Sequence, residues 1–239
     1  MDNQSNVINI SNRLKNIAST YAVDFVKSGM IIGLGSGSTA ELAIREIAKR
    51  VKNGKLSSII CIPSSTKTHS FAENLGLNII NFREIGEIDI TIDGADEVDP
   101  ELNLIKGGGG ALLKEKVLAQ NSKRNIIVIH ESKLSKRLGE KWSVPIEVLP
   151  FALETETKFL KNLGAEISLR IDENDTPFIT DQNNFILDAD FGAIEDLYEL
   201  SSEFEGRAGI IEHGLFIDIA DDVIVGCSDG IKHLTGGKS

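Results

Sequence analysis

Three short segments of this 239-residue chain combine residue types that bind anions or move protons. GLGSGSTA (33–40) joins glycines to hydroxyl side chains, DGADEVD (93–99) has closely spaced carboxylates, and KGGGGALLKEK (106–116) places four glycines after a lysine. A glycine run costs conformational entropy, so it is kept where a turn needs positive φ or where backbone must approach a ligand. A flexible surface loop is the alternative interpretation.

The first segment follows the apolar run MII (30–32) and precedes a helical pattern. Such a loop offers backbone N–H groups and a positive helix end, both suited to phosphate. Ser38 and Thr39 add hydroxyl donors, although both residue types are also ordinary N-caps. GSGSTA fits a loose dinucleotide pattern, but IICIPSST (59–66) lacks the acidic residue that binds a ribose hydroxyl, and the Walker A lysine is absent. The loop therefore predicts a phosphate site.

The carboxylates of the second segment follow the apolar run IDITI (88–92), at the expected carboxyl end of a strand. Ligands bind at this edge of an α/β sheet. Asp93 and Asp96 are separated by a Gly-Ala turn and can converge on one pocket. A divalent metal is one interpretation, and an acidic turn that caps backbone groups is another. Because the four histidines show no metal spacing, we expect no metal site.

The third segment places Lys106 nine residues before Glu115. Glu115 falls in a predicted helix, in which we expect Lys114 and Lys116 to face solvent. In isolation Glu115 is an ordinary surface residue. No Ser/His/Asp or Cys/His set accompanies the three segments. Together they suit proton transfer on a phosphorylated sugar, in which a carboxylate removes a proton beside a carbonyl and a cation stabilises the enediolate.

Strand and helix patterns alternate through the first half of the chain, which implies right-handed βαβ units and a parallel sheet covered on both faces. The predicted helices are 10–28, 39–54, 66–77 and 114–124, and the predicted strands are 30–35, 56–63, 78–82, 88–93 and 125–131. After Trp142 the pattern becomes that of a small α+β unit. Its predicted strands are 144–150, 165–171, 177–182 and 184–191, its helices are 152–163 and 193–206, and 214–234 is a last strand pair that returns to the first domain.

We therefore expect an α/β fold with two domains. Residues 1–140 and 218–239 form a Rossmann-like parallel-sheet main domain, and residues 141–217 form the smaller α+β domain. The net charge of −11 argues against nonspecific binding to nucleic acid or anionic membranes. No apolar run has transmembrane length and no signal-peptide core is present. Cys61 and Cys227 lie in apolar runs, which favours core packing in a reducing compartment, so we expect a cytoplasmic protein.

In this order and spacing, GSGST, DGADE and KGGGGALLKEK resemble the ribose-5-phosphate isomerase type A family. The resemblance runs from about Lys15 through Lys133 and more weakly to GIIEHGLF (209–216) and DGIK (229–232). It implies a smaller α+β (ferredoxin-like) lid domain, a homodimer or homotetramer, and no metal or organic cofactor. It also implies interconversion of ribose 5-phosphate and ribulose 5-phosphate through a cis-enediolate, within the pentose phosphate pathway.

The resemblance assigns roles to individual residues. Glu115 matches the general base, Lys106 the lysine that stabilises the enediolate oxygen, and Asp93 the carboxylate that handles hydroxyl protons, with Asp96 beside it in the sugar-binding turn. The other matches are substrate-binding positions: Lys15, Ser36, Gly37, Ser38, Thr39, Gly94, Ala95, Gly107, Gly108, Gly109 and Lys133. His130 and Glu131 depart from the family pattern, in the surroundings of Lys133 only. The glycines would let backbone pass close to the sugar, with Lys106 and Glu115 on opposite sides of the reacting carbons, so that a side chain at Gly107 or Gly108 obstructs substrate more than folding.

Two alternatives belong to other function classes. An amino-sugar-phosphate deaminase or a CoA transferase has similar Gly-Ser-Thr loops, but the KGGGG…KEK segment argues against both of these enzyme classes. The sugar-phosphate sensor of a transcriptional regulator would keep the phosphate loop without needing Glu115. Such a sensor carries a DNA-binding segment, for which this N-terminus has neither the length nor the basic charge.

Overall fold

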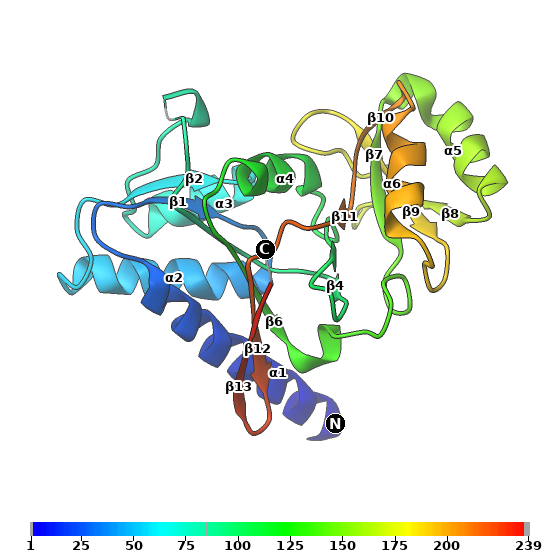
Figure 1. The fold of residues 1–239 in the computed structure, drawn as a ribbon. Coiled ribbons are helices and arrows are strands. Elements are labelled where there is room, and N and C mark those ends of the chain that lie inside the picture. Colours follow the sequence, from blue (N-terminus) through cyan, green and yellow to red (C-terminus); the bar gives the residue numbers. More distant parts are fainter. Residues whose placement is uncertain (1, 85, 237–239) are drawn as a thin grey trace. The chain divides into compact units, whose positions relative to one another are not determined.

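The computed structural model describes residues 2–84 and 86–236, which form two compact units (Figure 1). Unit 1 comprises Met1–Gly94, Val117–Ser132 and Ile219–Ser239, and unit 2 comprises Ala95–Lys116 and Lys133–Asp218. The unit boundaries fall at residues other than those of the domain ranges 1–140 with 218–239 and 141–217, which stay a prediction.

Unit 1 is built on a six-stranded sheet in the order β13-β12-β6-β3-β1-β2. Its strands are β1 (Ile31–Leu34), β2 (Ile60–Pro63), β3 (Ile90–Asp93), β6 (Asn125–His130), β12 (Asp222–Cys227) and β13 (Gly230–Thr235). All neighbours pair in parallel except β12 and β13, which are antiparallel. The apolar runs of the inner strands are buried, as strands covered on both faces require. The predicted α/β fold is confirmed.

Several helical elements accompany this sheet, and three of them pack side chains against it in one core cluster. The elements are α1 (Asp2–Ala22), η1 (Val23–Phe25), α2 (Ser38–Lys52), α3 (Thr66–Asn74) and η2 (Phe82–Glu84), followed later by α4 (Leu112–Gln120) and η3 (Glu131–Lys133). Ala18 of α1, Ile44 of α2 and Ala72 of α3 share one core cluster with the sheet. Leu118 of α4 packs in a separate cluster with Ile62 and Ile88. Figure 1 shows α1 and α2 lying against each other.

Unit 2 contains an antiparallel four-stranded sheet in the order β10-β7-β9-β8 and a small sheet in the order β11-β5-β4. The strands are β4 (Glu97–Val98), β5 (Leu104–Ile105), β7 (Val144–Val148), β8 (Glu166–Leu169), β9 (Phe185–Asp190), β10 (Ile210–His213) and β11 (Leu215–Phe216). η4 (Pro150–Ala152), α5 (Leu153–Asn162) and α6 (Leu197–Glu205) are its helices. Leu160 of α5 and Phe204 of α6 are fully buried in the core of the unit. The predicted smaller α+β unit is confirmed, and its main sheet is antiparallel.

Two predicted strands are wrong. Segment 78–82 contributes only an isolated bridge from Ile79 to Cys61, and segment 177–182 only one from Pro177 to Ile171. In the second case the Asp172 side chain accepts hydrogen bonds from the backbone of Asn174 and Thr176, so the chain closes into a local turn and does not extend the sheet. Within the described residues, no helix combines the length and apolar character needed to cross a bilayer.

The approach of α1 to β12 depends on Gly226. A Cβ atom at this position would lie 2.2 Å from the backbone oxygen of Leu14. Backbone cannot move aside as a flexible side chain can. The glycine therefore fixes how closely α1, and with it Lys15, approaches the sheet.

We expect Gly226→Ala to lower the free energy of unfolding by about 1–3 kcal/mol, because the added methyl group overpacks the interface between α1 and β12. Urea unfolding followed by circular dichroism measures this. Gly206→Ala is the matched control, since its Cβ would meet only carbonyl oxygens at ordinary distances of 3.8 and 3.9 Å. Equal stability of the two variants would contradict the assigned role of Gly226.

Candidate active site

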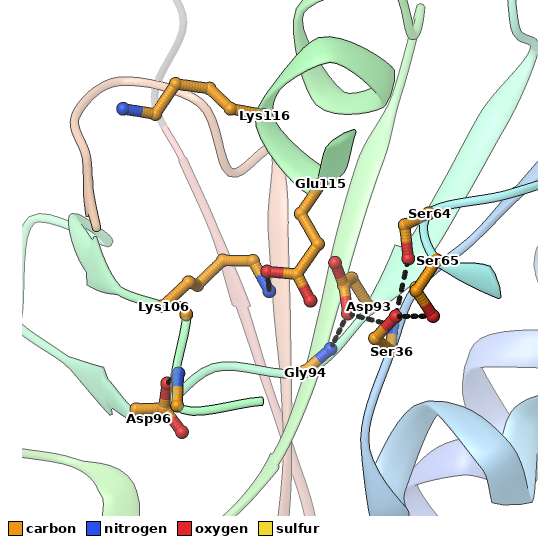
Figure 2. A network of polar contacts seen from close by, with 12 residues as sticks. Ser36, Ser64, Ser65, Asp93, Gly94, Asp96, Lys106, Glu115 and Lys116 are labelled. Atoms are coloured by element: carbon orange, nitrogen blue, oxygen red, sulfur yellow. Dashed lines mark hydrogen bonds and ion pairs between the residues drawn. The ribbon is translucent and has the colours of Figure 1, made fainter. Parts of the chain in front are cut away.

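The loop after β1 turns directly over Asp93, the last residue of β3. Asp93 is 3% exposed, and its Oδ1 accepts hydrogen bonds from the backbone N–H groups of Ser36 (3.1 Å) and Gly94 (2.7 Å). A Cβ atom at Gly35 would lie 2.0 Å from the same oxygen. The glycine loop thus packs directly on the Asp93 carboxylate, and its hydrogen bonds fix the orientation of that side chain (Figure 2).

Ser36 directs its hydroxyl group into a network with the β2–α3 turn. Its Oγ lies 2.8 Å from Ser64 Oγ and 2.9 Å from Ser65 Oγ (Figure 2). It also lies 3.0 Å from Thr68 Oγ1. Ser65 also caps α3 by accepting from Thr68 N–H. The sequence prediction for Ser36 was substrate binding, whereas the hydroxyl joins two loops here. Sequence reasoning missed Ser64, Ser65 and Thr68, although the hydroxyl cluster SST at the end of β2 was a usable signal.

The start of α2 combines a cation with hydroxyl groups and a helix N-terminus. Gly37 precedes the helix with φ of 92°, and the exposed Ser38 begins it. Lys15 Nζ donates to Ser38 Oγ at 3.0 Å, and the Ser19 hydroxyl donates to the Thr39 carbonyl at 3.0 Å. These two bonds join α1 to the first turn of α2. A lysine, a hydroxyl group and the positive end of a helix are a suitable set for an anion.

In unit 2, Lys106 and Glu115 form a buried ion pair. Lys106 Nζ lies 3.2 Å from Glu115 Oε2, and the two side chains are 5% and 6% exposed (Figure 2). Lys106 leaves the end of β5, and Glu115 projects from the first turn of α4. The Lys106 ammonium also lies 5.5 Å from the centre of the Phe216 ring. A charge-paired carboxylate beside a fixed ammonium has the parts needed to move a proton and to stabilise a negative oxygen.

Lys116 is buried, so its predicted exposure is wrong. Its Nζ donates to Glu212 Oε1 (2.5 Å) and to the His213 carbonyl (2.7 Å), and it lies 4.9 Å from the Phe216 ring centre. Burial lowers the pKa of Lys116, although Glu212 opposes that shift. Figure 2 shows Lys116 extending away from the Glu115 carboxylate, as the helix geometry of neighbouring residues requires. Lys114, in contrast, is 41% exposed and pairs with Asp181.

The glycine run packs more closely than a flexible loop. Gly108 N–H donates to Asp96 Oδ2 at 2.7 Å, and a Cβ at Gly108 would lie 2.8 Å from the same carboxylate. Gly107 has φ of 103°, and a Cβ there would press on Leu112 and Pro145 at 3.0 and 3.2 Å. A side chain at Gly107 would therefore strain the backbone and overpack its neighbours, so folding would suffer too. Whether a side chain at Gly107 or Gly108 obstructs substrate more than folding stays a prediction. At Gly109 a Cβ would meet no described atom within 4 Å.

Lys133 lies at the end of η3, with its ammonium 4.5 Å from the centre of the Trp142 ring. Gly94 and Ala95 are half-buried and link Asp93 to Asp96 along the chain. The predicted residues thus fall into two groups. Unit 1 holds Lys15, Ser36, Gly37, Ser38, Thr39, Asp93 and Gly94, and unit 2 holds Ala95, Asp96, Lys106, Gly107, Gly108, Gly109, Glu115 and Lys133.

Across residues 2–84 and 86–236, no three His, Cys, Asp or Glu side chains converge in a group that could hold a metal ion. The buried His213 lies beside Lys116, and burial together with this charge lowers the pKa of its imidazole to about 3. It is therefore a neutral side chain at physiological pH. Its ring Nδ1 accepts a hydrogen bond from the Leu215 N–H at 3.3 Å, which ties it to β11.

The family model for ribose 5-phosphate isomerase A (phosphoriboisomerase A) matches residues 60–230. A ribose-5-phosphate isomerase A of Desulfatibacillum aliphaticivorans is 52% identical over 221 residues, which cover 92% of this chain and 96% of the relative. One of Chloroflexus aurantiacus is 46% identical, with 92% of each chain covered.

Solved structures agree with these sequence relatives. A D-ribose-5-phosphate isomerase in complex with phospho-erythronic acid superposes with a TM-score of 0.92 at 40% identity, covering 94% of this chain and 99% of the other. The ribose 5-phosphate isomerase of Plasmodium falciparum gives a TM-score of 0.91 at 39% identity, covering 94% and 98%. On the extent of these matches, the chain belongs to the ribose 5-phosphate isomerase A family.

Proposed function

We propose that this protein interconverts D-ribose 5-phosphate and D-ribulose 5-phosphate through a cis-enediolate, as an isomerase of the pentose phosphate pathway. The buried Lys106–Glu115 ion pair carries the proposal, because it provides a base and a cation in one water-poor position. The family membership supports the same reaction. A relative in complex with phospho-erythronic acid supports a phosphorylated sugar acid as a ligand of the family's fold.

Glu115 acts as the general base in this proposal. It removes the proton from C2 of the open-chain aldose, and the electrons of that bond form the C1–C2 double bond while negative charge moves to the C1 oxygen. Lys106 stabilises that oxygen. Glu115 then returns the proton to C1, and the C2 oxygen becomes the ketone. An adjacent ammonium favours the ionised form of a carboxylate, which is the form that a base needs.

Asp93 and Asp96 handle the hydroxyl protons, which must pass from the C2 oxygen to the C1 oxygen, and Asp93 assists ring opening. Two backbone N–H groups hold Asp93 in one orientation, and Gly108 N–H holds Asp96. Fixed carboxylates of this kind can exchange a proton with a substrate hydroxyl without first reorganising.

The phosphate group is bound by the first turn of α2 together with Lys15. Ser38 and Thr39 supply hydroxyl donors, and Lys15, which donates to Ser38, supplies a positive charge. Lys133 is a further substrate contact. No metal or organic cofactor is required, so activity should survive treatment with EDTA.

We also propose that the protein is a cytoplasmic homodimer, with a homotetramer as the alternative. Phe151 of unit 2 is fully exposed, and burial of such a side chain would favour self-association. Light scattering of the purified chain would give twice the 26.0 kDa chain mass for a dimer. Cell fractionation tests the compartment.

We expect Glu115→Gln to lower kcat about 10²–10⁴-fold, because the amide cannot act as a base. Ketose formation from ribose 5-phosphate is followed with EDTA-treated protein, and circular dichroism verifies folding. Glu212→Gln is the matched control, since it breaks the neighbouring buried ion pair with Lys116 and leaves Glu115 intact.

Three results would contradict these assignments. Full activity of Glu115→Gln would remove Glu115 as the base and keep the isomerase. An equal loss of kcat in Glu212→Gln would mean that any broken ion pair in this region inactivates the protein. An inactive wild type whose melting temperature rises with ribose 5-phosphate would favour a sugar-phosphate sensor.

The glycine run yields a second test. We expect Gly109→Ala to lower kcat/KM about 10- to 200-fold, as one misplaced methyl group does at a close-fitting site, with little change in melting temperature. Gly107→Ala should instead lower the free energy of unfolding by about 1–3 kcal/mol through overpacking. Thermal melting and initial rates of both variants separate the two effects, and unchanged kcat/KM in Gly109→Ala would exclude close approach of substrate to this residue.

A further inference from the structure

Arg170 connects the edge of the antiparallel sheet to the glycine run. It follows β8 directly, and its side chain is 14% exposed. Its Nη1 donates to the carbonyl of Gly107 at 2.7 Å and to that of Gly108 at 3.1 Å. No feature of the sequence surrounding Arg170 predicted this contact, because 62 residues separate it from Gly108.

Asp188 of β9 fixes the guanidinium group. Arg170 Nε donates to Asp188 Oδ2 at 2.9 Å, and Nη2 donates to Oδ1, so the pair is bidentate. Ser168 of β8 lies opposite Asp188 in the sheet register, and Arg170, two residues further, is on the same face. A diagonal pair at this separation is within reach of a long side chain. The sheet therefore presents Nη1 at a defined position.

Peptide planarity transmits this position to the N–H groups of the glycine run. In a trans peptide the C=O and the following N–H point in opposite directions. Because Arg170 holds the Gly107 carbonyl, the Gly108 N–H points the other way, where it donates to Asp96 Oδ2 at 2.7 Å. Because Arg170 also holds the Gly108 carbonyl, the Gly109 N–H points away from the guanidinium as well.

Glycine backbone would otherwise sample many orientations at this point. The contacts to Arg170 and Asp96 hold opposite ends of one peptide unit, between Gly107 and Gly108. Lys106 directly precedes this peptide, and its own N–H donates to the Gly214 carbonyl at 2.9 Å. Backbone contacts on both sides of the Lys106 Cα therefore limit where its ammonium can lie.

We propose that Arg170, fixed by Asp188, is a positioning residue for the isomerase reaction, which orients the Gly107–Gly108 peptide and thereby Lys106 and Asp96. The inference rests on the proposed function. Arg170 itself need touch no reacting atom. Its contribution is geometric, and displacement of reactive groups by about 1 Å can cost about 100-fold in rate.

A cavity of about 360 Å³ lies on the Arg170 side of the loop and is lined by Gly108, Lys141, Trp142, Ser143, Arg170 and Asp188. The cavity is large enough for a guanidinium ion to enter once the Arg170 side chain has been truncated. This permits chemical rescue, in which free guanidinium replaces the missing group between Asp188 and the glycine carbonyls.

The experiment compares Arg170→Ala, Arg170→Lys and wild type in steady-state assays with ribose 5-phosphate. We expect Arg170→Ala to lose about 10- to 100-fold in kcat and to recover part of it in millimolar guanidinium chloride. Arg170→Lys should have a kcat little higher than that of Arg170→Ala, because one ammonium cannot bridge a carboxylate and two carbonyls in the planar geometry of arginine. Wild type measured in the same guanidinium concentrations corrects for denaturation and salt.

Arg207→Ala is the matched control. Arg207 makes the same kind of bidentate pair with Glu156, at 2.9 and 3.0 Å, in the same unit, and within the described residues none of its hydrogen bonds reaches the glycine run. Its loss should lower the melting temperature about as much as that of Arg170, with kcat unchanged and no rescue by guanidinium.

The outcomes distinguish failure of the positioning role of Arg170 from failure of the proposed isomerase activity. Inactive wild type would overturn the function itself. Active wild type with unchanged kcat in folded Arg170→Ala would overturn the positioning role alone. If Arg170→Ala does not fold, Arg170→Lys decides, and wild-type kcat in that variant would equally overturn the role. Loss of kcat without any rescue in Arg170→Ala, together with an equal loss in Arg207→Ala, would overturn the positioning role and assign both pairs to the general stability of the unit.

Discussion

The buried ion pair between Lys106 and Glu115 is the constraint around which β5, the glycine run and the start of α4 are arranged. Removing two charges from water costs several kcal/mol for each ion, and their attraction repays this only with good geometry and further partners. Here the Phe216 ring lies against the ammonium, β11 pairs with β5 to hold that ring, and α4 presents the carboxylate from its first turn. A pair of this kind is weak evidence for stability. Its burial is better explained by the chemical role proposed for it.

The need to bring Lys106 and Glu115 together also explains the glycine run between them. Lys106 must leave β5, and the chain must then reverse within a few residues so that Glu115 returns to it. Each glycine serves this reversal differently. Gly107 takes a positive φ against Leu112 and Pro145, Gly108 allows Asp96 to approach, and Gly110 leaves room for the Phe178 ring. Gly109 alone faces open space, which makes it the position best suited to contact a ligand.

Sequence patterns predicted the alternating elements, because burial on both faces leaves apolar runs that are readable locally. They also predicted Lys106, Glu115 and the carboxylates, through their order along the chain. They did not predict contacts that depend on distant residues. Lys116 was expected in solvent, and its partner Glu212 lies 96 residues away. Arg170 was not predicted for the same reason, since it contacts a glycine run that only the fold brings beside it. Ser64 was missed although the hydroxyl cluster at the end of β2 pointed to it.

Net charge sets the last condition on the proposed substrate. A protein of charge −11 repels a sugar phosphate at long range, although physiological salt screens exposed charges beyond about 8 Å. Binding must then rest on close contacts. The charge of Lys106 is largely matched by Glu115, so it serves the enediolate oxygen better than the phosphate. In the proposed site, Lys15 beside the positive end of α2 is the cation assigned to the phosphate. The proposed mechanism thus assigns phosphate recognition and proton transfer to two different lysines, so that neither lysine has to serve both.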